Sequence, residues 1–205
     1  MVSFPVFDGL GGITQAWNRV GHHDKLVQAY TQRLKETADA GYERLICFSG
    51  NRAGLDDEQG SENCAAGLKK ILPLAEKLKV TLCLELLNSK RTHKDYQCDH
   101  VPWGVELVKR IGSGRFKLLY DIYHMQIMDG DICDTIRENH ECFDHYHTGG
   151  VPGRNEIDGT QELNYARIMQ AIVTTGYKGY VAQEFVPKYP DALASLRSAV
   201  QICDV

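Results

Sequence analysis

Five short runs of apolar, β-branched and aromatic residues recur along the 205-residue chain, and they constrain its fold more than any other feature. The runs are near-continuous in hydrophobicity rather than alternating, which is typical of strands covered on both faces of a parallel sheet. We expect buried strands at Arg44 to Ser49, Val80 to Leu87, Phe116 to Ile122, Phe143 to Thr148 and Tyr180 to Phe185. The sequence therefore predicts an α/β fold.

Segments with helical periodicity lie between these runs. The clearest is Asp24 to Ala40, which places Leu26, Tyr30 and Leu34 on one face and is followed by Gly41 as a C-terminal cap. Further helices are predicted at Glu58 to Leu78, Val101 to Ile111, Ile132 to Asn139, Asn164 to Thr175 and Asp191 to Ile202. Strand starts recur at about the 30-residue length of a βαβ unit, and no linker interrupts them. We expect one domain over residues 1–205.

Two architectures repeat strand and helix in this way, the open doubly wound sheet and the eightfold barrel. A dinucleotide-binding sheet would carry a G-x-G-x-x-G motif after its first strand, and no such motif follows any run here. The reactive residues instead recur at the carboxyl end of strand after strand. That arrangement is how a TIM barrel assembles a site.

The number of strands departs from a full barrel, which has eight strands in about 250 residues. Five are clear, and Met1 to Phe7, followed by Asp8 and Gly9, would be a sixth. We therefore expect a (β/α)8 TIM barrel lacking about the first two βα units. Such a chain would leave an open sheet edge and exposed core, so we expect either that the chain is a truncated form of a longer protein or that a partner, such as a second copy in a homo-oligomer, covers the gap.

Composition narrows the class of partner. The formal net charge is -4 and basic residues are scattered, so nothing predicts a surface for nucleic acid or an anionic membrane. No apolar run reaches the roughly 20 residues of a membrane span, and the first ten residues lack the order of a secretory signal. The seven cysteines include no C-x-x-C pair, and we interpret them as free thiols. These features favour a cytoplasmic protein with a small-molecule partner.

Three acidic residues stand at or near the ends of apolar strands. Glu85 lies in Thr81 to Ser89, Asp121 ends the run that begins at Phe116, and Glu184 lies near the end of the run from Tyr180. A buried carboxylate must be protonated, paired or bound to a cation. A Lys or Arg could pair with any one of them, but acids at equivalent ends of several strands favour a shared cation.

Two histidines, His145 and His147, lie on one strand and point the same way because side chains alternate with a period of two. His147 is nearer the strand end, so we predict that it is the ligand and that His145 lies a layer deeper. A set of three carboxylates and one imidazole suits one Mg²⁺ or Mn²⁺ ion, with Co²⁺ or Zn²⁺ as alternatives. The predicted metal ligands are Glu85, Asp121, His147 and Glu184.

Two further residues are candidates for substrate binding. Arg154 lies in the glycine-rich turn Gly149 to Glu156, from which its guanidinium could hold a carboxylate or another substrate oxygen. His124 follows Asp121 by three residues, just beyond the strand. Neither a G-x-S-x-G nucleophile elbow nor a P-loop is present in the sequence.

These segments, LELLNS, YDIYHMQ, HYHTGGVPGRNE with GTQELNYARI, and GYKGYVAQEF, together resemble the hydroxypyruvate isomerase family of the xylose-isomerase-like TIM barrels. The resemblance runs from about Arg44 onward. It implies a sugar isomerase or epimerase with one divalent metal held at the four residues named above. It also implies substrate contacts for His124 and Arg154. Some members of the family have Gln where His147 stands.

From this resemblance we expect an intramolecular oxidoreductase that interconverts hydroxypyruvate and tartronate semialdehyde through an enediolate. Glu85 and Glu184 would act as the two catalytic bases, one removing a proton and the other returning it. Three alternatives remain: a ketose or sugar epimerase of the same superfamily, a metal-dependent hydrolase like the apurinic endonucleases, and a non-catalytic protein that binds a metal or sugar acid.

Overall fold

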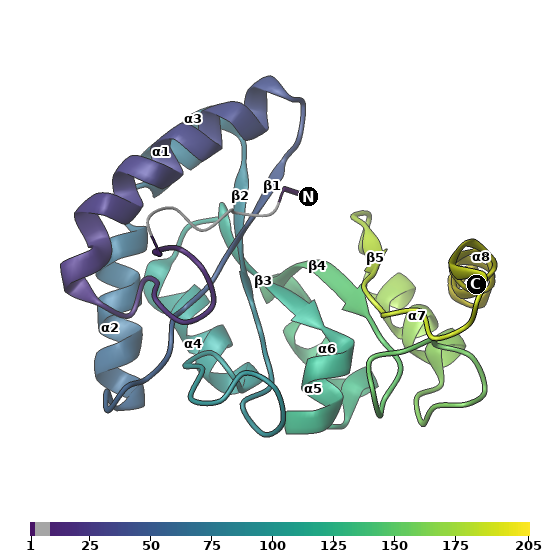
Figure 1. Ribbon diagram of the computed structural model, residues 1–205. Coiled ribbons are helices and arrows are strands. Elements are labelled where there is room, and N and C mark those ends of the chain that lie inside the picture. Colours follow the sequence, from purple (N-terminus) through teal and green to yellow (C-terminus); the bar gives the residue numbers. More distant parts are fainter. Residues whose placement is uncertain (3–8) are drawn as a thin grey trace. The chain divides into compact units, whose positions relative to one another are not determined.

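The computed structural model of the chain describes residues 1–2 and 9–205, and these divide into two compact units, Met1–Leu119 and Tyr120–Val205. Helices and strands alternate along both units (Figure 1). The strands are β1 (Arg44–Cys47), β2 (Thr81–Glu85), β3 (Phe116–Asp121), β4 (Phe143–Thr148) and β5 (Val181–Gln183). The helices are α1 (His23–Asp39), α2 (Asp57–Leu68), α3 (Leu72–Leu78), α4 (Val101–Ile111), α5 (Ile122–Met128), α6 (Ile132–Asn139), α7 (Tyr165–Thr174) and α8 (Ala192–Cys203). The prediction of a single domain stays a prediction.

In the first unit β1 pairs with β2 and β2 pairs with β3, and in the second unit β4 pairs with β5, all in parallel. Each βα step returns the chain to the next parallel position, as the alternating pattern predicts. The register pairs Glu85 with Leu119 in the first unit and His147 with Ala182 in the second. All five predicted strands are present, and the α/β expectation with consecutive parallel strands is confirmed.

Two helical details differ from the sequence prediction. The segment predicted as one helix from Glu58 to Leu78 is two helices, α2 and α3, because Pro73 lies at the start of α3. A proline has no N–H to donate and its ring clashes with the preceding turn, so a continuous helix cannot pass through it. The second difference is α5, a helix that the sequence pattern does not predict and that begins immediately after Asp121.

One face of α1 packs into the core of the first unit. Leu26, Tyr30 and Leu34 are buried on one face of this helix, as the periodicity predicts, and the Trp17 ring lies 5.1 Å from the Tyr30 ring. Val2 forms a parallel bridge with Leu45 of β1. The rest of the predicted strand from Met1 to Phe7, and Asp8 after it, lies outside the described residues.

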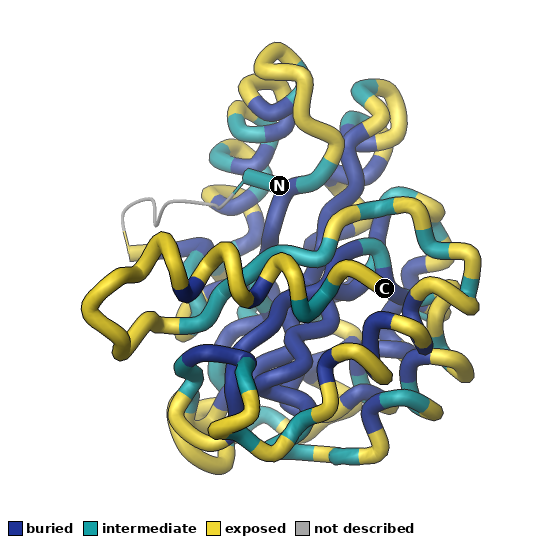
Figure 2. Tube along the Cα trace, turned by 90° about the vertical axis from the view of Figure 1, so that its right-hand side faces the viewer, coloured by how far each residue is buried: buried dark blue, intermediate teal, exposed yellow. Residues whose placement is uncertain are grey.

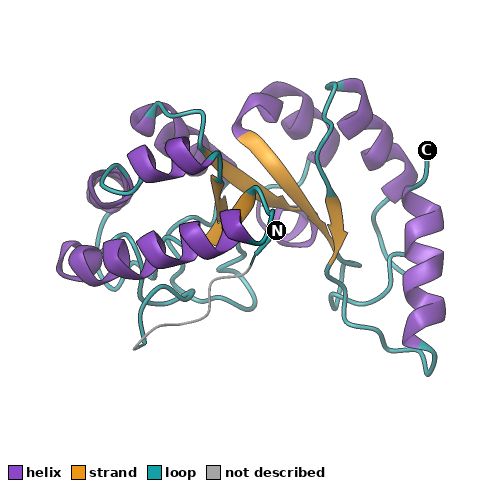
Figure 3. Ribbon diagram, turned by 90° about the horizontal axis from the view of Figure 1, so that it is seen from above, coloured by secondary structure: helices purple, strands orange, loops and turns teal. Residues whose placement is uncertain are grey.

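The second unit packs aromatic side chains behind β4. The ring centroid of Tyr120 lies 4.7 Å from that of Phe143 and 6.1 Å from that of Tyr146. These large apolar contacts stabilise the strand that carries His147. Helix α8, which leads to the C terminus in Figure 3, contacts both β5 and α7. Five of the six residues of β4 are buried, and His147 is one of them.

The last helix, α8, is mostly exposed, as the largely yellow tube that leads to the C terminus in Figure 2 shows. Its buried residues are the small Ser195 and Ala199, whereas Leu193 is 66% exposed and Val200 is 55% exposed. In the described part of the chain, every helix is too short or too polar to span a bilayer.

Candidate functional site

Asp121 holds the junction between β3 and α5. Its side chain is buried, and Oδ1 accepts a hydrogen bond from the backbone N–H of His124 at 3.0 Å, which caps the first turn of α5. The other oxygen, Oδ2, lies 3.3 Å from Nη2 of Arg154 and 3.9 Å from Nδ1 of His147. One carboxylate oxygen thus fixes the local backbone, while the other faces the candidate site.

His147 and Glu184 come from neighbouring parallel strands. The backbone N–H of Glu184, one residue beyond β5, donates to the carbonyl of Thr148 at 3.1 Å, which continues the pairing of β4 with β5. This pairing brings Nδ1 of His147 to 2.8 Å from Oε2 of Glu184. The imidazole is buried, whereas the Glu184 side chain is 41% exposed. The glutamate therefore lies where a substrate could reach it.

The ligand atoms of Asp121, His147 and Glu184 all lie within 4.8 Å of one another. They come from three successive strands, as the sequence predicts. Two carboxylates and one imidazole are suitable donors for a divalent ion. The second unit alone thus supplies three of the four predicted ligands in one cluster.

Arg154 lies between the two acids of this cluster. Its Nη2 donates a hydrogen bond to Oε2 of Glu184 and also contacts Asp121, and the guanidinium carbon lies 5.4 Å from the centre of the Tyr123 ring. The backbone of Arg154 is left-handed, with φ of 59°. A non-glycine residue adopts this conformation at some cost, so the surrounding loop must hold it in place.

Electrostatics keep Glu184 ionised. Desolvation alone would raise the pKa of Glu184, but the hydrogen bond and positive charge of His147 and the charge of Arg154 lower the pKa to about 2. A carboxylate that remains charged at neutral pH can bind a cation or accept a proton.

His124, the other predicted substrate-binding residue, lies in the first turn of α5. Its side chain is fully buried, with Nε2 3.7 Å from Oδ2 of Asp121 and its ring 5.0 Å from the Tyr123 ring. Its position follows from the capping bond to Asp121, since that bond starts the helix at the strand end. The assignment of His124 and Arg154 to substrate binding stays a prediction.

Glu85 belongs to the first unit. It is the last residue of β2, and its backbone carbonyl accepts a hydrogen bond from the Tyr96 hydroxyl at 2.9 Å. The residue is 5% exposed, so the carboxylate is in a buried position, as predicted. In the register of β2 with β3 it pairs with Leu119, two residues before Asp121 along the chain.

Sequence reasoning missed two residues that hold the loop after β4. The Tyr165 hydroxyl donates to the carbonyl of Gly149 at 2.8 Å and accepts from the N–H of Gly149 at 2.9 Å. Glu156, which is 4% exposed, accepts hydrogen bonds from the segment after β5. Neither residue lies at a strand end, so the rule that located the metal ligands could not find them.

Comparison with known proteins agrees with this architecture. The family model described as xylose isomerase-like TIM barrel matches residues 14–200. Hydroxypyruvate isomerase of Escherichia coli is 26% identical over 172 residues, which are 82% of this chain and 65% of that protein. The 2-oxo-tetronate isomerase of Cupriavidus necator is 31% identical over 109 residues, covering 53% of this chain and 41% of that protein. The chain spans between 38% and 65% of the length of the first curated relatives.

Solved structures share the fold. A protein from Brucella melitensis described as AP endonuclease, family 2, has a structure with a TM-score of 0.87 and 25% identity, covering 97% of this chain and 76% of its own. The D-psicose 3-epimerase of Clostridium cellulolyticum has a TM-score of 0.75 and 20% identity, covering 89% of this chain and 72% of its own. The sequence-based resemblance to this group of barrels is confirmed. The chain belongs to the xylose isomerase-like TIM barrel family.

Proposed function

We propose that this protein is a divalent-metal-dependent isomerase that interconverts hydroxypyruvate and tartronate semialdehyde. The observation that carries the proposal is the cluster of Asp121, His147 and Glu184, with the guanidinium of Arg154 against both of its acids. Relatives named hydroxypyruvate isomerase and 2-oxo-tetronate isomerase support a substrate with a carbonyl group beside a carboxylate.

The metal site would comprise Glu85, Asp121, His147 and Glu184, with the first of these supplied by the end of β2. The donor set fits Mg²⁺ or Mn²⁺, and Co²⁺ or Zn²⁺ are alternatives, because carboxylate oxygens outnumber the single imidazole nitrogen. A bound divalent ion would polarise the substrate carbonyl and stabilise the negative charge that develops on its oxygen. Asp121 is tied by its cap to α5, so its role would be to hold the ion rather than to move a proton.

Glu85 and Glu184 would move the substrate proton. One carboxylate removes a proton from C3 of hydroxypyruvate, and the other returns a proton to C2 of the enediolate, while the hydroxyl proton passes from O3 to O2. The low pKa of Glu184 keeps it in the basic form at neutral pH. His124 would stabilise negative charge on the substrate oxygen. Its imidazole lies beside Asp121, a proposed metal ligand, and therefore next to the proposed site.

Arg154 would bind the substrate carboxylate. Its guanidinium offers several donors in a plane, which match a carboxylate better than a point charge does. The Tyr123 ring supports one side of this guanidinium. A neutral ketose has no carboxylate to pair with Arg154, so this residue favours a sugar acid over a free sugar.

An epimerase is the main alternative, since the D-psicose 3-epimerase of Ruminiclostridium cellulolyticum is 30% identical over 134 residues, 63% of this chain. A nuclease is less well supported, despite the endonuclease name of the Brucella protein. Nuclease sites of this kind hold more than one metal ion, whereas the predicted ligand set of three carboxylates and one imidazole suits a single ion. The formal net charge of -4 also disfavours a DNA partner.

The test is an assay of chelator-treated protein with hydroxypyruvate, a panel of ketoses and abasic DNA, each with and without added Mg²⁺ or Mn²⁺. We expect tartronate semialdehyde to form from hydroxypyruvate only when metal is added. Faster conversion of a ketose would favour the epimerase, and strand cleavage would favour the nuclease. Metal binding without turnover of any substrate would identify a binding protein. Near-wild-type turnover by Glu85→Gln or Glu184→Gln with metal bound would contradict the two-base scheme.

A further inference from the structure

Glu156 is a buried carboxylate that has no cationic partner among the described residues. The residue is 4% exposed. Its side-chain hydrogen bonds converge on Oε1, which accepts from the N–H of Lys188 at 3.0 Å, the N–H of Tyr189 at 3.1 Å and the hydroxyl of Ser195 at 2.9 Å. Burying a charge without a counter-ion is costly. The hydrogen bonds to Oε1 must therefore offset this cost and hold Glu156 at this position in the fold.

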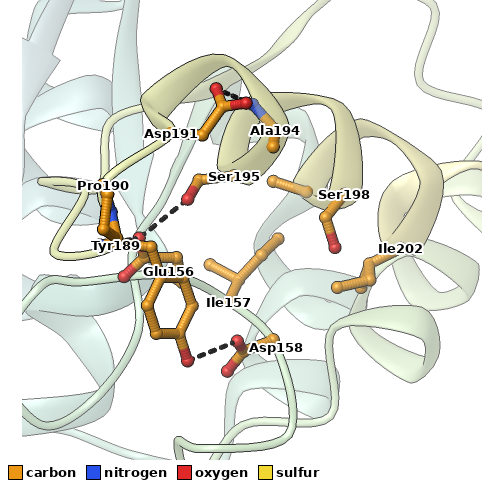
Figure 4. Close-up of a pocket in the computed structure, with 11 residues that line it drawn as sticks. Glu156, Ile157, Asp158, Tyr189, Pro190, Asp191, Ala194, Ser195, Ser198 and Ile202 are labelled. Atoms are coloured by element: carbon orange, nitrogen blue, oxygen red, sulfur yellow. Dashed lines mark hydrogen bonds between the residues drawn. The ribbon is translucent and has the colours of Figure 1, made fainter.

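The bonds of Glu156 join two segments that each carry a residue of the candidate site. We call residues 149–156, which follow β4, the β4 loop, and residues 184–189, which follow β5, the β5 segment. The β4 loop carries Arg154 and the β5 segment begins with Glu184. Figure 4 shows Glu156 bonded to Ser195 of α8, next to Tyr189. The three residues line a cavity of about 480 Å³.

Two more hydrogen bonds connect the same segments nearer the site. The N–H of Val186 donates to the carbonyl of Arg154 at 2.6 Å, and the Asn155 side chain donates to the carbonyl of Val186 at 2.9 Å. The bonds from Glu156 to the N–H groups of Lys188 and Tyr189 lie farther along the same two segments. The β4 loop and the β5 segment are therefore connected at both places, mostly through backbone groups.

This arrangement fixes Arg154 relative to Glu184. Arg154 has a left-handed backbone, and its guanidinium reaches Glu184 across the two segments. Charge-assisted hydrogen bonds to backbone N–H groups are stronger than neutral ones, so the ionised Glu156 anchors the β5 segment more firmly than a neutral side chain would. A shift of about 1 Å between groups of an active site can lower the rate by about a hundredfold.

We propose that Glu156 is a positioning residue, which sets the distance between Arg154 and Glu184 by anchoring the β5 segment to the β4 loop. It would contact neither metal nor substrate. The proposal rests on the proposed function where it concerns turnover, but the anchoring itself can be measured without any substrate.

The test compares Glu156→Ala with Glu156→Gln, which keeps a carbonyl acceptor of the same length, and with two control variants, one in α8 and one at its N-cap. Ser195→Ala removes only the bond to the helix. Asp191→Ala removes the helix cap, in which Asp191 accepts from the N–H of Ala194 at 2.9 Å. The three measurements are amide hydrogen exchange of residues 184–189, Mn²⁺ affinity, and kcat and KM for hydroxypyruvate.

We expect Glu156→Ala to speed amide exchange in the β5 segment and to lower Mn²⁺ affinity or kcat by about 10- to 100-fold, the usual effect of losing a residue that orients a ligand. Glu156→Gln should recover most of this loss. Both control variants should stay within about threefold of the wild-type affinity and turnover, a free-energy change of less than about 1 kcal/mol.

Two results would overturn the positioning role. One is Glu156→Ala with wild-type exchange in residues 184–189, and the other is an equal loss of Mn²⁺ affinity in Asp191→Ala, which would assign the effect to the docking of α8. A wild-type chain that binds no Mn²⁺ and converts no hydroxypyruvate would instead contradict the proposed function. The amide-exchange comparison would then still decide whether Glu156 anchors the segment.

Discussion

Nδ1 of His147 lies 2.8 Å from Oε2 of Glu184, and this contact joins two successive strands at their carboxyl ends. The pairing of β4 with β5 produces it, because Glu184 continues the ladder by donating to Thr148. An imidazole and a carboxylate held this close can share one cation, and the Asp121 carboxylate lies beside them. The first prediction concerns the imidazole.

We predict that His147→Ala lowers Mn²⁺ affinity by at least about tenfold, whereas His147→Gln keeps measurable binding because its amide oxygen can replace the nitrogen ligand. Titration calorimetry with Mn²⁺ would measure both. Thermal unfolding of the two variants provides the control, since a loss of affinity counts only if the variant is folded. Unchanged Mn²⁺ affinity in a folded His147→Ala variant would exclude this residue as a ligand.

Arg154 should affect substrate binding more than metal binding. Hydrogen bonds to charged groups contribute about 1.5–3 kcal/mol each, so we expect Arg154→Met to lower kcat/KM for hydroxypyruvate by about 10- to 100-fold. Arg154→Lys should retain part of the activity, because it keeps the charge but loses the planar set of donors. Steady-state kinetics would show the difference. An equal effect on a neutral ketose would contradict pairing with a carboxylate.

Gly150 is required by the close approach of the chain to itself in the β4 loop. A Cβ there would lie 2.3 Å from the carbonyl oxygen of Glu156 and 2.9 Å from that of Asn155, and backbone atoms cannot move aside easily. We predict that Gly150→Ala displaces Arg154 and lowers the melting temperature and turnover. Gly159→Ala is the matched control, because a Cβ at that glycine meets nothing within 4 Å. Similar behaviour of the two variants would refute this role for Gly150.

The buried Glu156 predicts a dependence of stability on pH. Desolvation acts to raise the pKa of Glu156, but the N–H groups of Glu156, Tyr189 and Lys188 and the Ser195 hydroxyl outweigh it and lower the pKa. A folded-state pKa below the unfolded value, about 4.3, gives stability that is fully present above that pH and is lost as the pH falls through the folded-state pKa.

Urea unfolding from about pH 7 to about pH 3 would test this dependence, with the free energy of unfolding of wild type compared with that of Glu156→Gln. The difference between the two proteins should be largest near neutral pH and should shrink in acid. A difference that grows as the pH falls would have the wrong sign and would contradict the assignment.

Much of the site could be predicted from a simple physical rule about the ends of parallel strands. An acidic residue in an apolar strand is costly to bury unless it is protonated, paired or bound to a cation. Parallel strands also bring their carboxyl ends to one edge of the sheet, where several such residues can bind the same cation. That rule located Asp121, His147 and Glu184, which the structure brings together. It also predicted Glu85 at the end of β2.

The remaining features depend on contacts that no local pattern reports. Helix α5 is only seven residues long, and it starts because Asp121 caps it while also facing the site. Pro73 marked the break between α2 and α3, but the apolar periodicity on either side concealed it. Glu156 is followed by residues that look like an ordinary polar loop, and its partners lie more than 30 residues later. Only the folded chain reveals that it joins two segments.

The most direct test is hydrogen exchange at C3 of hydroxypyruvate in deuterated water, followed by proton NMR with wild type and Glu184→Gln, each with Mn²⁺ or with a chelator. The NMR sample would be freed of the paramagnetic ion before the spectrum is recorded. We predict deuterium at C3 and formation of tartronate semialdehyde with wild type and metal, neither of them with chelator, and no tartronate semialdehyde with Glu184→Gln. Wild-type protein that binds Mn²⁺ but incorporates no deuterium above the enzyme-free rate would contradict the proposed isomerase.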